Sequence, residues 1–331
     1  MTKVICIGSA TQDIFFPTEE GKVIETPEEI TSQRKIAFEL GAKYKISERF
    51  ESLGGCSANV ASGLAKQGIE TIHYTAIGND MEGEWIRKKH EELGIGTDLL
   101  ETCDCKSDLS LIIVDKNTGE RTIFHHKEAN ERFFFDIEKL SGADWAYVGD
   151  IFGDWKSIIS RIIEKSHSEG ISIAFNPRQA MLTEDKQKLF ELFGFCKIVF
   201  LNKDEALEIL SGLDIETGGK EEEYLLREIQ KSGVKVAVIT DGENGAWAIE
   251  GDKVVQVKAL KEKQVDSTGA GDAFASGFLA AHIKGRNLEE CLAWGVSNGG
   301  SVVNYYGGIE GLLDEEKISE KSKTVKIDQF K

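Results

Sequence analysis

The segment VDSTGAGDAFASG, residues 265–277, carries the strongest signal in the sequence. Gly269 and Gly271 flank Ala270 and stand directly before an apolar stretch of helical composition. Glycines allow backbone N–H groups to converge without obstruction by a Cβ atom, and the start of a helix adds a positive partial charge. The segment therefore predicts an anion hole suited to a phosphate group, followed by a helix over about residues 272–283.

Asp272 stands at the entrance of this helix and has two interpretations. Asp is common at the N-cap of a helix, where its carboxylate accepts a hydrogen bond from the backbone. A carboxylate beside a phosphate cradle is repelled by the phosphate, however, so this position calls for a function. Accepting a proton from an attacking hydroxyl supplies one. The residue by itself leaves both roles open.

The rest of the chain alternates between apolar runs of strand length and helical segments. The run at residues 4–7 ends in Gly8 and is typical of a buried parallel strand. Comparable runs lie at 71–77, 145–148, 171–175, 198–201 and 236–239, and an antiparallel pair is expected at 246–249 and 253–257. The pattern predicts a single α/β domain over residues 1–331. We expect a mostly parallel sheet of about eight or more strands with helices on both faces, and ligands at the carboxyl ends of the strands.

Two β-rich regions interrupt this alternation. Residues 109–114 and 121–125 flank DKNTGE, which is typical of a β-hairpin. The charged region 18–50 contains short β-like pieces such as residues 35–40. The sequence therefore predicts a small β lid built from about residues 15–52 and 102–128.

Composition narrows the classes of partner. Hydrophobic residues make up 40% of the 331 residues, which is enough for a large core. The chain has 40 Lys and Arg against 57 Asp and Glu, for a net charge of −17. An acidic surface repels nucleic acid and anionic lipid, so we expect neither as a partner. The first apolar run is too short for a signal peptide and no run approaches the ~18 apolar residues of a membrane span, so a cytoplasmic protein is expected.

The six cysteines are scattered along the chain, which fits a reducing cytosol better than a disulfide framework. Cys103 and Cys105, with His125 and His126 further on, could be taken for a metal site. Zinc pairs usually stand two to four residues apart, however, and both pairs fall in predicted strand edges. The preferred interpretation is surface residues of a β region.

The motif from Asp266 to Asp272 resembles the second signature of the ribokinase-like (PfkB) carbohydrate kinase family. Gly54-Gly55 followed by Asn59 at a helix start resembles the first signature, about two hundred residues earlier. The resemblance covers essentially the whole chain, including the hairpin between the motifs. It implies a three-layer α/β/α ribokinase-like fold with a β lid. It also implies an ATP-dependent kinase that transfers the γ-phosphate to a hydroxyl of a sugar or sugar-like substrate.

The resemblance also implies roles for individual residues. Asp272 matches the family's base, and Gly269, Ala270 and Gly271 match its anion hole. On the substrate side, the matching positions are Asp13, Gly54, Gly55 and Asn59. Cys56 is a departure, because ribokinase commonly has Lys after the glycine pair, and this weakens an assignment to ribose.

Positions that match the family's nucleotide and metal sites lie later in the chain. The motif NKDE at residues 202–205 matches N-x-x-E, in which Asn202 faces the phosphates and Glu205 helps to hold Mg²⁺; its structural alternative is a helix cap. The other expected nucleotide contacts are Thr240, Gly242, Gly245, Thr268 and Asn298, although residues 240–246 could also be an ordinary turn. Asp266 and Thr268 match a loop that often binds K⁺. Arg178, after the strand at 171–175, is expected either near substrate or phosphate or in solvent.

Other functions fit the sequence less well. The segment after the first strand lacks the second and third glycines of a dinucleotide fingerprint, and no P-loop motif occurs. A non-catalytic sugar-binding or regulatory relative of the same fold is the remaining rival, and the intact motif around Asp272 argues against it. Among kinases the acceptor stays open between a simple sugar, a 2-keto-3-deoxy acid and a nucleoside. The lid of this family often forms homodimers, and exposed strand edges favour such pairing.

Overall fold

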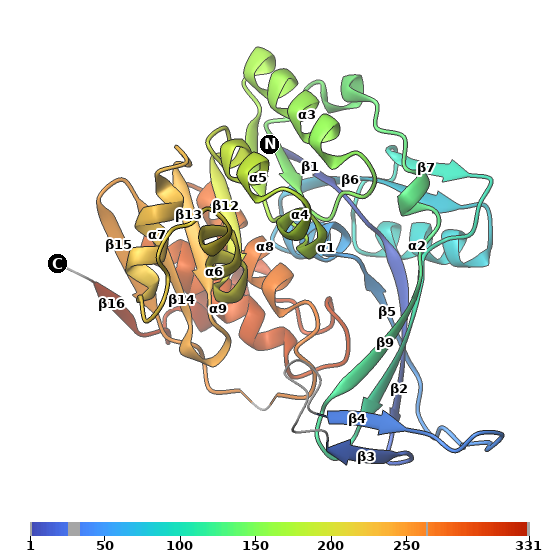
Figure 1. Cartoon of the computed structure of the whole chain (residues 1–331). Coiled ribbons are helices and arrows are strands. Elements are labelled where there is room, and N and C mark those ends of the chain that lie inside the picture. The colour runs from blue at the N-terminus through green and yellow to red at the C-terminus, as the bar shows by residue number, and fades with distance from the viewer. Residues whose placement is uncertain (1, 26–33, 263, 330–331) are drawn as a thin grey trace.

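The computed structural model describes residues 2–25, 34–262 and 264–329. Within these ranges the central sheet has ten strands, in an order that Figure 1 shows from left to right. They are β16 (Ile327–Gln329), β15 (Lys253–Val257), β14 (Ala246–Glu250), β13 (Val236–Thr240), β12 (Ile198–Asn202), β11 (Ser172–Phe175), β10 (Trp145–Val148), β1 (Lys3–Ile7), β6 (Glu70–Gly78) and β7 (Leu100–Cys103). Strands β13 to β7 of this order pair in parallel, and β14, β15 and β16 pair antiparallel. The prediction of a mostly parallel sheet, ending in an antiparallel pair, is confirmed.

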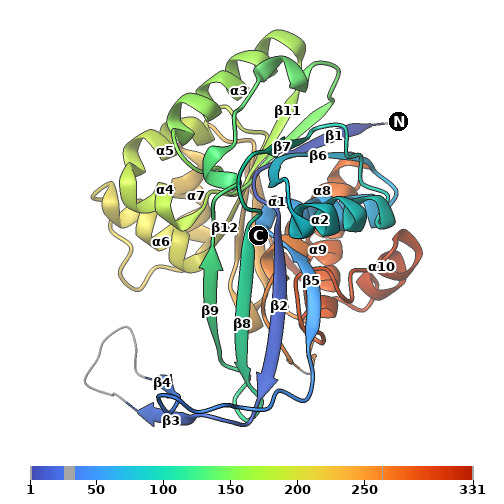
Figure 2. The same cartoon turned by 90° about the vertical axis from the view of Figure 1, so that its right-hand side faces the viewer.

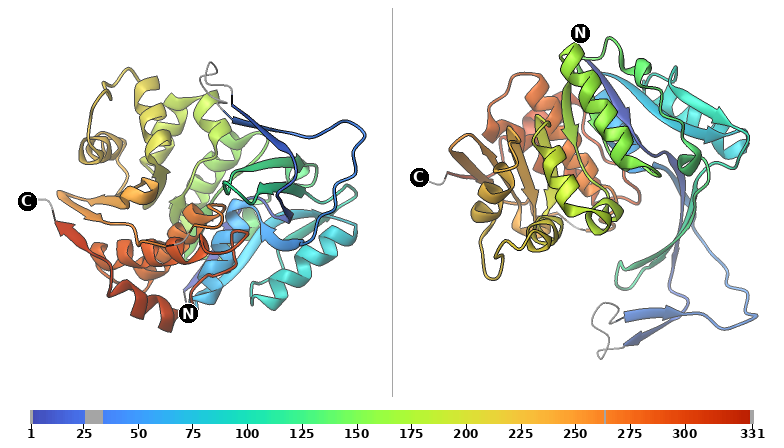
Figure 3. Two further views of the ribbon diagram at one scale, coloured as in Figure 1. Left: turned by 90° about the horizontal axis from the view of Figure 1, so that it is seen from below. Right: turned by 45° about the horizontal axis from the view of Figure 1, so that its top comes forward.

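Helices cover both faces of this sheet, as Figure 3 shows. One face packs against α3 (Trp155–Glu169), α4 (Gln179–Glu184), α5 (Lys186–Phe193), α6 (Lys203–Gly212) and α7 (Glu222–Gln230). The opposite face packs against α1 (Cys56–Lys66), α8 (Ala270–Ile283), α9 (Leu288–Val302) and α10 (Glu315–Ser322). Strand β1 shows why both faces are apolar. Val4 and Cys6 point into one core and Ile5 and Ile7 into the other, because successive side chains of a strand alternate.

The remaining elements lie at one edge and in the connections. Helix α2 (Met81–Glu92) packs beside β6. Its Ile86 is buried in an apolar cluster that is separate from the two cores on the faces of the central sheet. Short 3₁₀ helices occur at η1 (Asn130–Arg132), η2 (Ile137–Leu140) and η3 (Gly242–Asn244). No helix in the described ranges is both long enough and apolar enough to cross a bilayer.

A second, smaller sheet projects from the body (Figure 2). This lid sheet has the strand order β5 (Phe50–Gly54), β2 (Thr11–Thr18), β8 (Leu109–Asp115) and β9 (Arg121–His126). A separate hairpin of β3 (Lys22–Glu25) and β4 (Arg34–Ala37) lies at its far end. The predicted hairpin is thus the β8–β9 pair, whereas β7, at the start of the predicted range 102–128, belongs to the central sheet. Residues 26–33 of the predicted range 15–52 lie outside the described residues.

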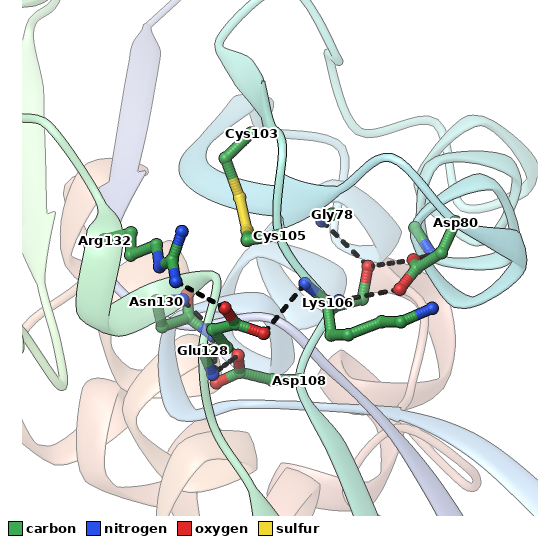
Figure 4. The surroundings of a disulfide bond; sticks show 11 residues. Gly78, Asp80, Cys103, Cys105, Lys106, Asp108, Glu128, Asn130 and Arg132 are labelled. Carbon is green, nitrogen blue, oxygen red and sulfur yellow. Dashed lines mark hydrogen bonds and ion pairs between the residues drawn. A yellow bond between two sulfur atoms is a disulfide. The ribbon is translucent and has the colours of Figure 1, made fainter.

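Cysteine pairing differs from the sequence expectation. Cys103 and Cys105 form a disulfide at the end of β7, as Figure 4 shows, and the other four cysteines are free. The chain turns directly after β7 and brings the two Cα atoms to 5.3 Å, which is a bonding separation. Cys103 and Cys105 are half-buried residues at a strand end, as expected, but the preference for reduced cysteines did not include this local disulfide, because a close approach made by a turn has no signature in cysteine spacing.

A chain of buried polar groups ties β6 to α1 and α2. The Nδ1 atom of His73 lies 2.8 Å from Nε2 of His90, whose Nδ1 atom lies 2.8 Å from the carbonyl oxygen of Ile86. The Nε2 atom of His73 lies 2.8 Å from the hydroxyl of Ser57. Burial lowers the pKa of His90 to about 4 and lowers the pKa of His73 well below its usual value. Both rings are therefore neutral in the folded protein.

Candidate active site

A cavity of about 250 Å³ opens at the carboxyl ends of four neighbouring parallel strands. Asp150 follows β10, Asn176 follows β11, and Asn202 and Thr240 end β12 and β13. The register pairs Asn202 directly with Thr240, so both polar side chains arrive at one level. The opposite wall is the start of α8 with the first residue of α1, which contribute Gly271, Asp272, Phe274 and Cys56. The site lies where ligands bind in open parallel sheets, as the sequence predicts.

The start of α8 forms one wall of this cavity. Gly269 is its N-cap in a left-handed conformation with φ 71°, and a Cβ atom there would collide with the backbone of Gly308. No side chain caps this helix. A Cβ atom added to Gly271 would meet open space. Gly271 and Asp272 line the cavity at this helix start, whereas the N–H of Ala270 donates to the carbonyl oxygen of Ser267 at 3.3 Å. The N–H groups of Gly271 and Asp272 are thus the candidates for binding an anion.

The turn is held in place by close packing of α8 on α9. A Cβ atom at Gly277 would stand 2.8 Å from the carbonyl oxygen of Trp294, and one at Gly299 would stand 2.9 Å from that of Ala270. Glycines at both positions let the two backbones approach each other. The start of α8 thus belongs to a closely packed helix pair.

Asp272 is the third residue of α8 and not its N-cap. The alternative role of Asp272 as the N-cap of this helix is therefore excluded. Its Oδ2 atom accepts a hydrogen bond of 2.8 Å from Nδ2 of Asn59, which is on α1, and it also interacts with the Cys56 side chain. Burial raises the pKa of Asp272 to about 6. A half-buried carboxylate of this pKa is ionised at neutral pH and is a stronger base than a solvated one.

A second group of expected site residues comes from the lid sheet and from α1. Asp13 on β2 is 6% exposed, and its Oδ1 atom has no hydrogen-bond partner. Burial raises the pKa of Asp13 to about 7. Gly54 lies beside it, since a Cβ atom at Gly54 would collide with the Asp13 carboxylate, and one at Gly55 would collide with the Ser9 carbonyl. The Oδ1 atom of Asn59 is likewise buried without a partner. None of these residues lines the cavity, and Asn59 is linked to it through its hydrogen bond to Asp272. Two buried acceptors without partners leave room for hydrogen-bond donors from a ligand.

Asn202 and Glu205 form a capping box at the start of α6. Asn202 Oδ1 accepts from the backbone N–H of Glu205 at 2.8 Å, and Glu205 Oε2 accepts from that of Asn202 at 2.8 Å. Both residues nevertheless line the cavity. Burial, and to a smaller degree the nearby carboxylates of Asp204 and Asp272, raise the pKa of Glu205 to about 7. Asn202 and Glu205 therefore cap α6 and line the cavity at the same time.

Asp150 and Arg178 complete the cavity. Asp150 Oδ1 accepts from the backbone N–H of Ser9 at 3.1 Å, and its other oxygen accepts from the Ser9 hydroxyl. We did not predict Asp150, and its one signal is a polar residue shortly after an apolar strand. The Arg178 guanidinium stacks on the Phe152 ring at 4.1 Å and lines the cavity, so it is not merely a solvated side chain.

Other expected site residues do not line this cavity. Gly242 and Gly245 belong to the turn at η3, beyond Thr240. Asn298 is fully buried, and its side chain bonds to Ala273, Ser276 and the backbone N–H of Leu313. It could therefore contribute to nucleotide binding only through its helix. Asp266 and Thr268 lie in the loop that precedes Gly269 and bond to each other.

Comparisons with known proteins identify the family and the fold of this chain. Residues 1–315 match the model of the pfkB family carbohydrate kinases. A nucleoside kinase of Methanothermobacter thermautotrophicus is 31% identical over 245 residues, which are 72% of this chain and 74% of that protein. An uncharacterized sugar kinase of Archaeoglobus fulgidus is 28% identical over 257 residues, 76% of this chain and 98% of that protein. The crystal structure of a Methanocaldococcus jannaschii nucleoside kinase superposes with a TM-score of 0.76 at 24% identity and covers 98% of each chain.

The match covers nearly the whole chain, and the fold has the three layers and the lid sheet that the motifs imply. The chain is therefore a phosphotransferase of ribokinase-like fold, and it belongs to the PfkB family of carbohydrate kinases.

Proposed function

We propose that this protein transfers the γ-phosphate of ATP to a hydroxyl of a sugar or of a sugar moiety, with Asp272 as the general base. The observation that carries the proposal is the position of this carboxylate. It lies in the first turn of a helix whose N-cap is a glycine, and it lines the same cavity as Asn202 and Thr240. The base and the phosphate-binding N–H groups are thus next to each other.

The chemistry follows from these neighbours. Asp272 would accept the proton of the substrate hydroxyl as the oxygen attacks the γ-phosphorus and the bond to the β-phosphate oxygen breaks. Asn59 orients the carboxylate through its 2.8 Å hydrogen bond. The N–H groups around Gly269, Ala270 and Gly271 would stabilise the charge on the transferring phosphoryl group. Each group acts where charge changes during the transfer.

The substrate would be recognised through its hydroxyls. The unpaired Oδ1 atoms of Asp13 and Asn59 accept hydrogen bonds, and sugar hydroxyls donate them. Simple sugars, sugar acids and nucleosides all share this feature. The similar proteins include both a sugar kinase and nucleoside kinases, so the proposal extends to a nucleoside acceptor. A regulatory protein that only binds sugar would not need the pairing of Asn59 with Asp272.

Mg²⁺ fits the carboxylates of this cavity. Asp150, Glu205 and Asp272 all line it, and the pKa of Glu205 is raised mainly by burial and to a smaller degree by neighbouring carboxylates. Glu205, directly or through water, would help to hold the ion, which neutralises phosphate charge during transfer. Glu205→Gln is expected to raise the Mg²⁺ concentration needed for half-maximal rate. An unchanged Mg²⁺ requirement would remove Glu205 from this role.

Asp266 and Thr268 are the residues that would hold K⁺. The oxygens of Asp266 accept hydrogen bonds from Thr268 and Gly307, and the Arg121 guanidinium, 3.4 Å from Oδ1, already supplies a positive charge beside this carboxylate. We assign no step to a monovalent cation.

The experiment that tests the proposal is a screen of ATP consumption with free sugars, sugar acids and nucleosides as acceptors. We expect acceptor-dependent ADP release in at least one class, and its loss in Asp272→Asn. Binding of a sugar without any ADP release would favour the non-catalytic alternative.

We also propose a homodimer that forms through the lid sheet. Ile123 and Phe124 on β9, and Val23 and Ile24 on β3, are exposed apolar side chains on this projecting part of the molecule. Exposed strands with apolar side chains favour pairing with a second chain. Light scattering at micromolar concentration should give the dimer mass, and a monomer mass would reject this proposal.

A cytoplasmic location is a further proposal, supported by four unpaired cysteines, of which Cys6, Cys196 and Cys291 are buried. The Cys103–Cys105 disulfide is the one feature that argues against a reducing compartment. Cell fractionation that finds the protein in an oxidising compartment would contradict it.

A further inference from the structure

Asp266 organises the loop that leads into α8. Its side chain is 1% exposed. Oδ1 accepts hydrogen bonds from the backbone N–H of Thr268 at 3.0 Å and from its hydroxyl at 2.7 Å, and Oδ2 accepts from the N–H of Gly307 at 3.2 Å. The carboxylate thus ties the residues just before Gly269 to the segment that contains Gly308, against which Gly269 packs. These hydrogen bonds of Asp266 help to hold the conformation of Gly269, the N-cap of α8.

A positive charge beside the Asp266 carboxylate comes from the lid sheet. Arg121, the first residue of β9, places an Nη1 atom 3.4 Å from Asp266 Oδ1. The same atom donates a hydrogen bond of 3.0 Å to the Ser267 hydroxyl. The side chain is 28% exposed, and its Nε atom is buried without a partner. A carboxylate as buried as Asp266 is unfavourable without a counter-charge, and Arg121 provides one.

We propose that Arg121 is a positioning residue for phosphoryl transfer. It acts through Asp266 and Ser267 on the left-handed turn at Gly269, and hence on the N–H groups that face the transferred phosphate. The inference rests on the proposed function. Because Arg121 belongs to the lid sheet, which also carries Asp13, the placement of the lid over the substrate and the formation of the anion hole are coupled.

Removal of Arg121 should lower the rate of phosphoryl transfer more than it weakens the binding of acceptor and ATP. Removal of the guanidinium leaves Asp266 buried with only neutral donors, so the loop before Gly269 shifts or loosens. Misplacement of a catalytic group by about 1 Å can reduce the rate of a reaction about 100-fold. We therefore expect Arg121→Ala to lower kcat by about 10- to 100-fold, with KM for acceptor and for ATP changed by less than about threefold.

The matched control is Arg49→Ala. Arg49 precedes β5, is 62% exposed, and pairs with Glu51 at 2.7 Å, so its removal deletes an exposed lid ion pair of the usual small value. Arg121→Lys keeps the charge and loses the forked geometry, and we expect an intermediate rate. This variant carries the test if Arg121→Ala does not fold. Added guanidinium ion at millimolar concentration should restore part of the rate of Arg121→Ala and leave the wild type and Arg49→Ala unchanged.

A second readout does not depend on the reaction. Hydrogen exchange at the amide of Thr268, which donates to Asp266, should be at least about tenfold faster in Arg121→Ala than in the wild type or in Arg49→Ala. If the wild type phosphorylates no acceptor, the proposed function fails and the positioning role in phosphoryl transfer fails with it, whereas exchange still shows whether Arg121 holds the loop before Gly269. If the wild type is active and Arg121→Ala matches Arg49→Ala in kcat and in exchange, this inference is wrong and the proposed function stands.

Discussion

Asp272→Asn should inactivate the protein and stabilise it at the same time. Asn keeps the shape and can still accept a hydrogen bond from Asn59, but it cannot take up a proton. General-base catalysis typically contributes about 10²- to 10⁴-fold, so kcat should fall by that factor. The KM values for ATP and acceptor should change much less, because the loss is confined to the transition state.

The gain in stability follows from the raised pKa. Burial raises the pKa of Asp272 from 3.8 to about 6, so at pH 8 the carboxylate is ionised in both states but its ionisation is less favourable in the folded protein than in the unfolded chain. Since the folded pKa lies above the unfolded one, this destabilisation is present above pH 6 and disappears below about pH 4. Two units correspond to an upper bound of about 3 kcal/mol, and partial exposure and the helix N-terminus reduce this. We expect a gain of about 1–2 kcal/mol, or about 2–3 °C in Tm for a chain of this length.

The assay combines steady-state kinetics with thermal unfolding at pH 8. Asp314→Asn is the control, because Asp314 is an ordinary exposed N-cap of α10 that accepts from Lys317, and it should change neither kcat nor Tm by much. A variant Asp272→Asn with near-wild-type kcat would refute the assignment of the base. A fall in Tm of several degrees would instead show that the carboxylate stabilises the fold.

Three further predictions use the same proteins. The rate at saturating substrate should fall as pH drops through about 6, because the Asp272 base becomes protonated, and a flat pH–rate profile down to pH 5 would contradict this. Gly54→Ala should raise KM for the acceptor at least about tenfold with little change in KM for ATP, because its Cβ atom would displace the Asp13 carboxylate. Gly218→Ala is the control, since a Cβ atom there meets open space. Equal kinetics of the two variants would count against a substrate site at Asp13. His90, with a folded pKa of about 4, is neutral in the folded protein and protonates on unfolding, so it should lower the free energy of unfolding by about 2 kcal/mol between pH 7.5 and pH 5, against opposite contributions from Asp13, Glu205 and Asp272. In urea titrations the change between these pH values should therefore differ by about this amount between the wild type and His90→Gln, and it should be the same in the wild type and in His126→Gln, in which an exposed residue is replaced.

Local sequence was sufficient wherever the physical cause is local. The apolar run of β1 and the runs after it determine buried strands, because both of their faces must be covered. The glycines around Ala270 favour a left-handed start of α8, since Gly269 adopts φ 71° as its N-cap. The segment 109–125 determines the hairpin of β8 and β9. Each of these features depends on neighbouring residues in the chain and not on contacts between distant ones.

Contacts between distant residues were decided by the tertiary structure. Asn59 reaches Asp272 over 213 positions, and Arg121 reaches Ser267 over 146. Neither pair has a local pattern, because a hydrogen bond across the fold depends on where two separate backbones are placed. The same reason explains why Asp150 was missed and why the side chain of Asn298 turned out to be engaged between helices. The sequence by itself thus determined the strands, the hairpin and the glycine turn of this protein, and the packing of distant elements decided how Asp272 is held and which charge stands beside Asp266.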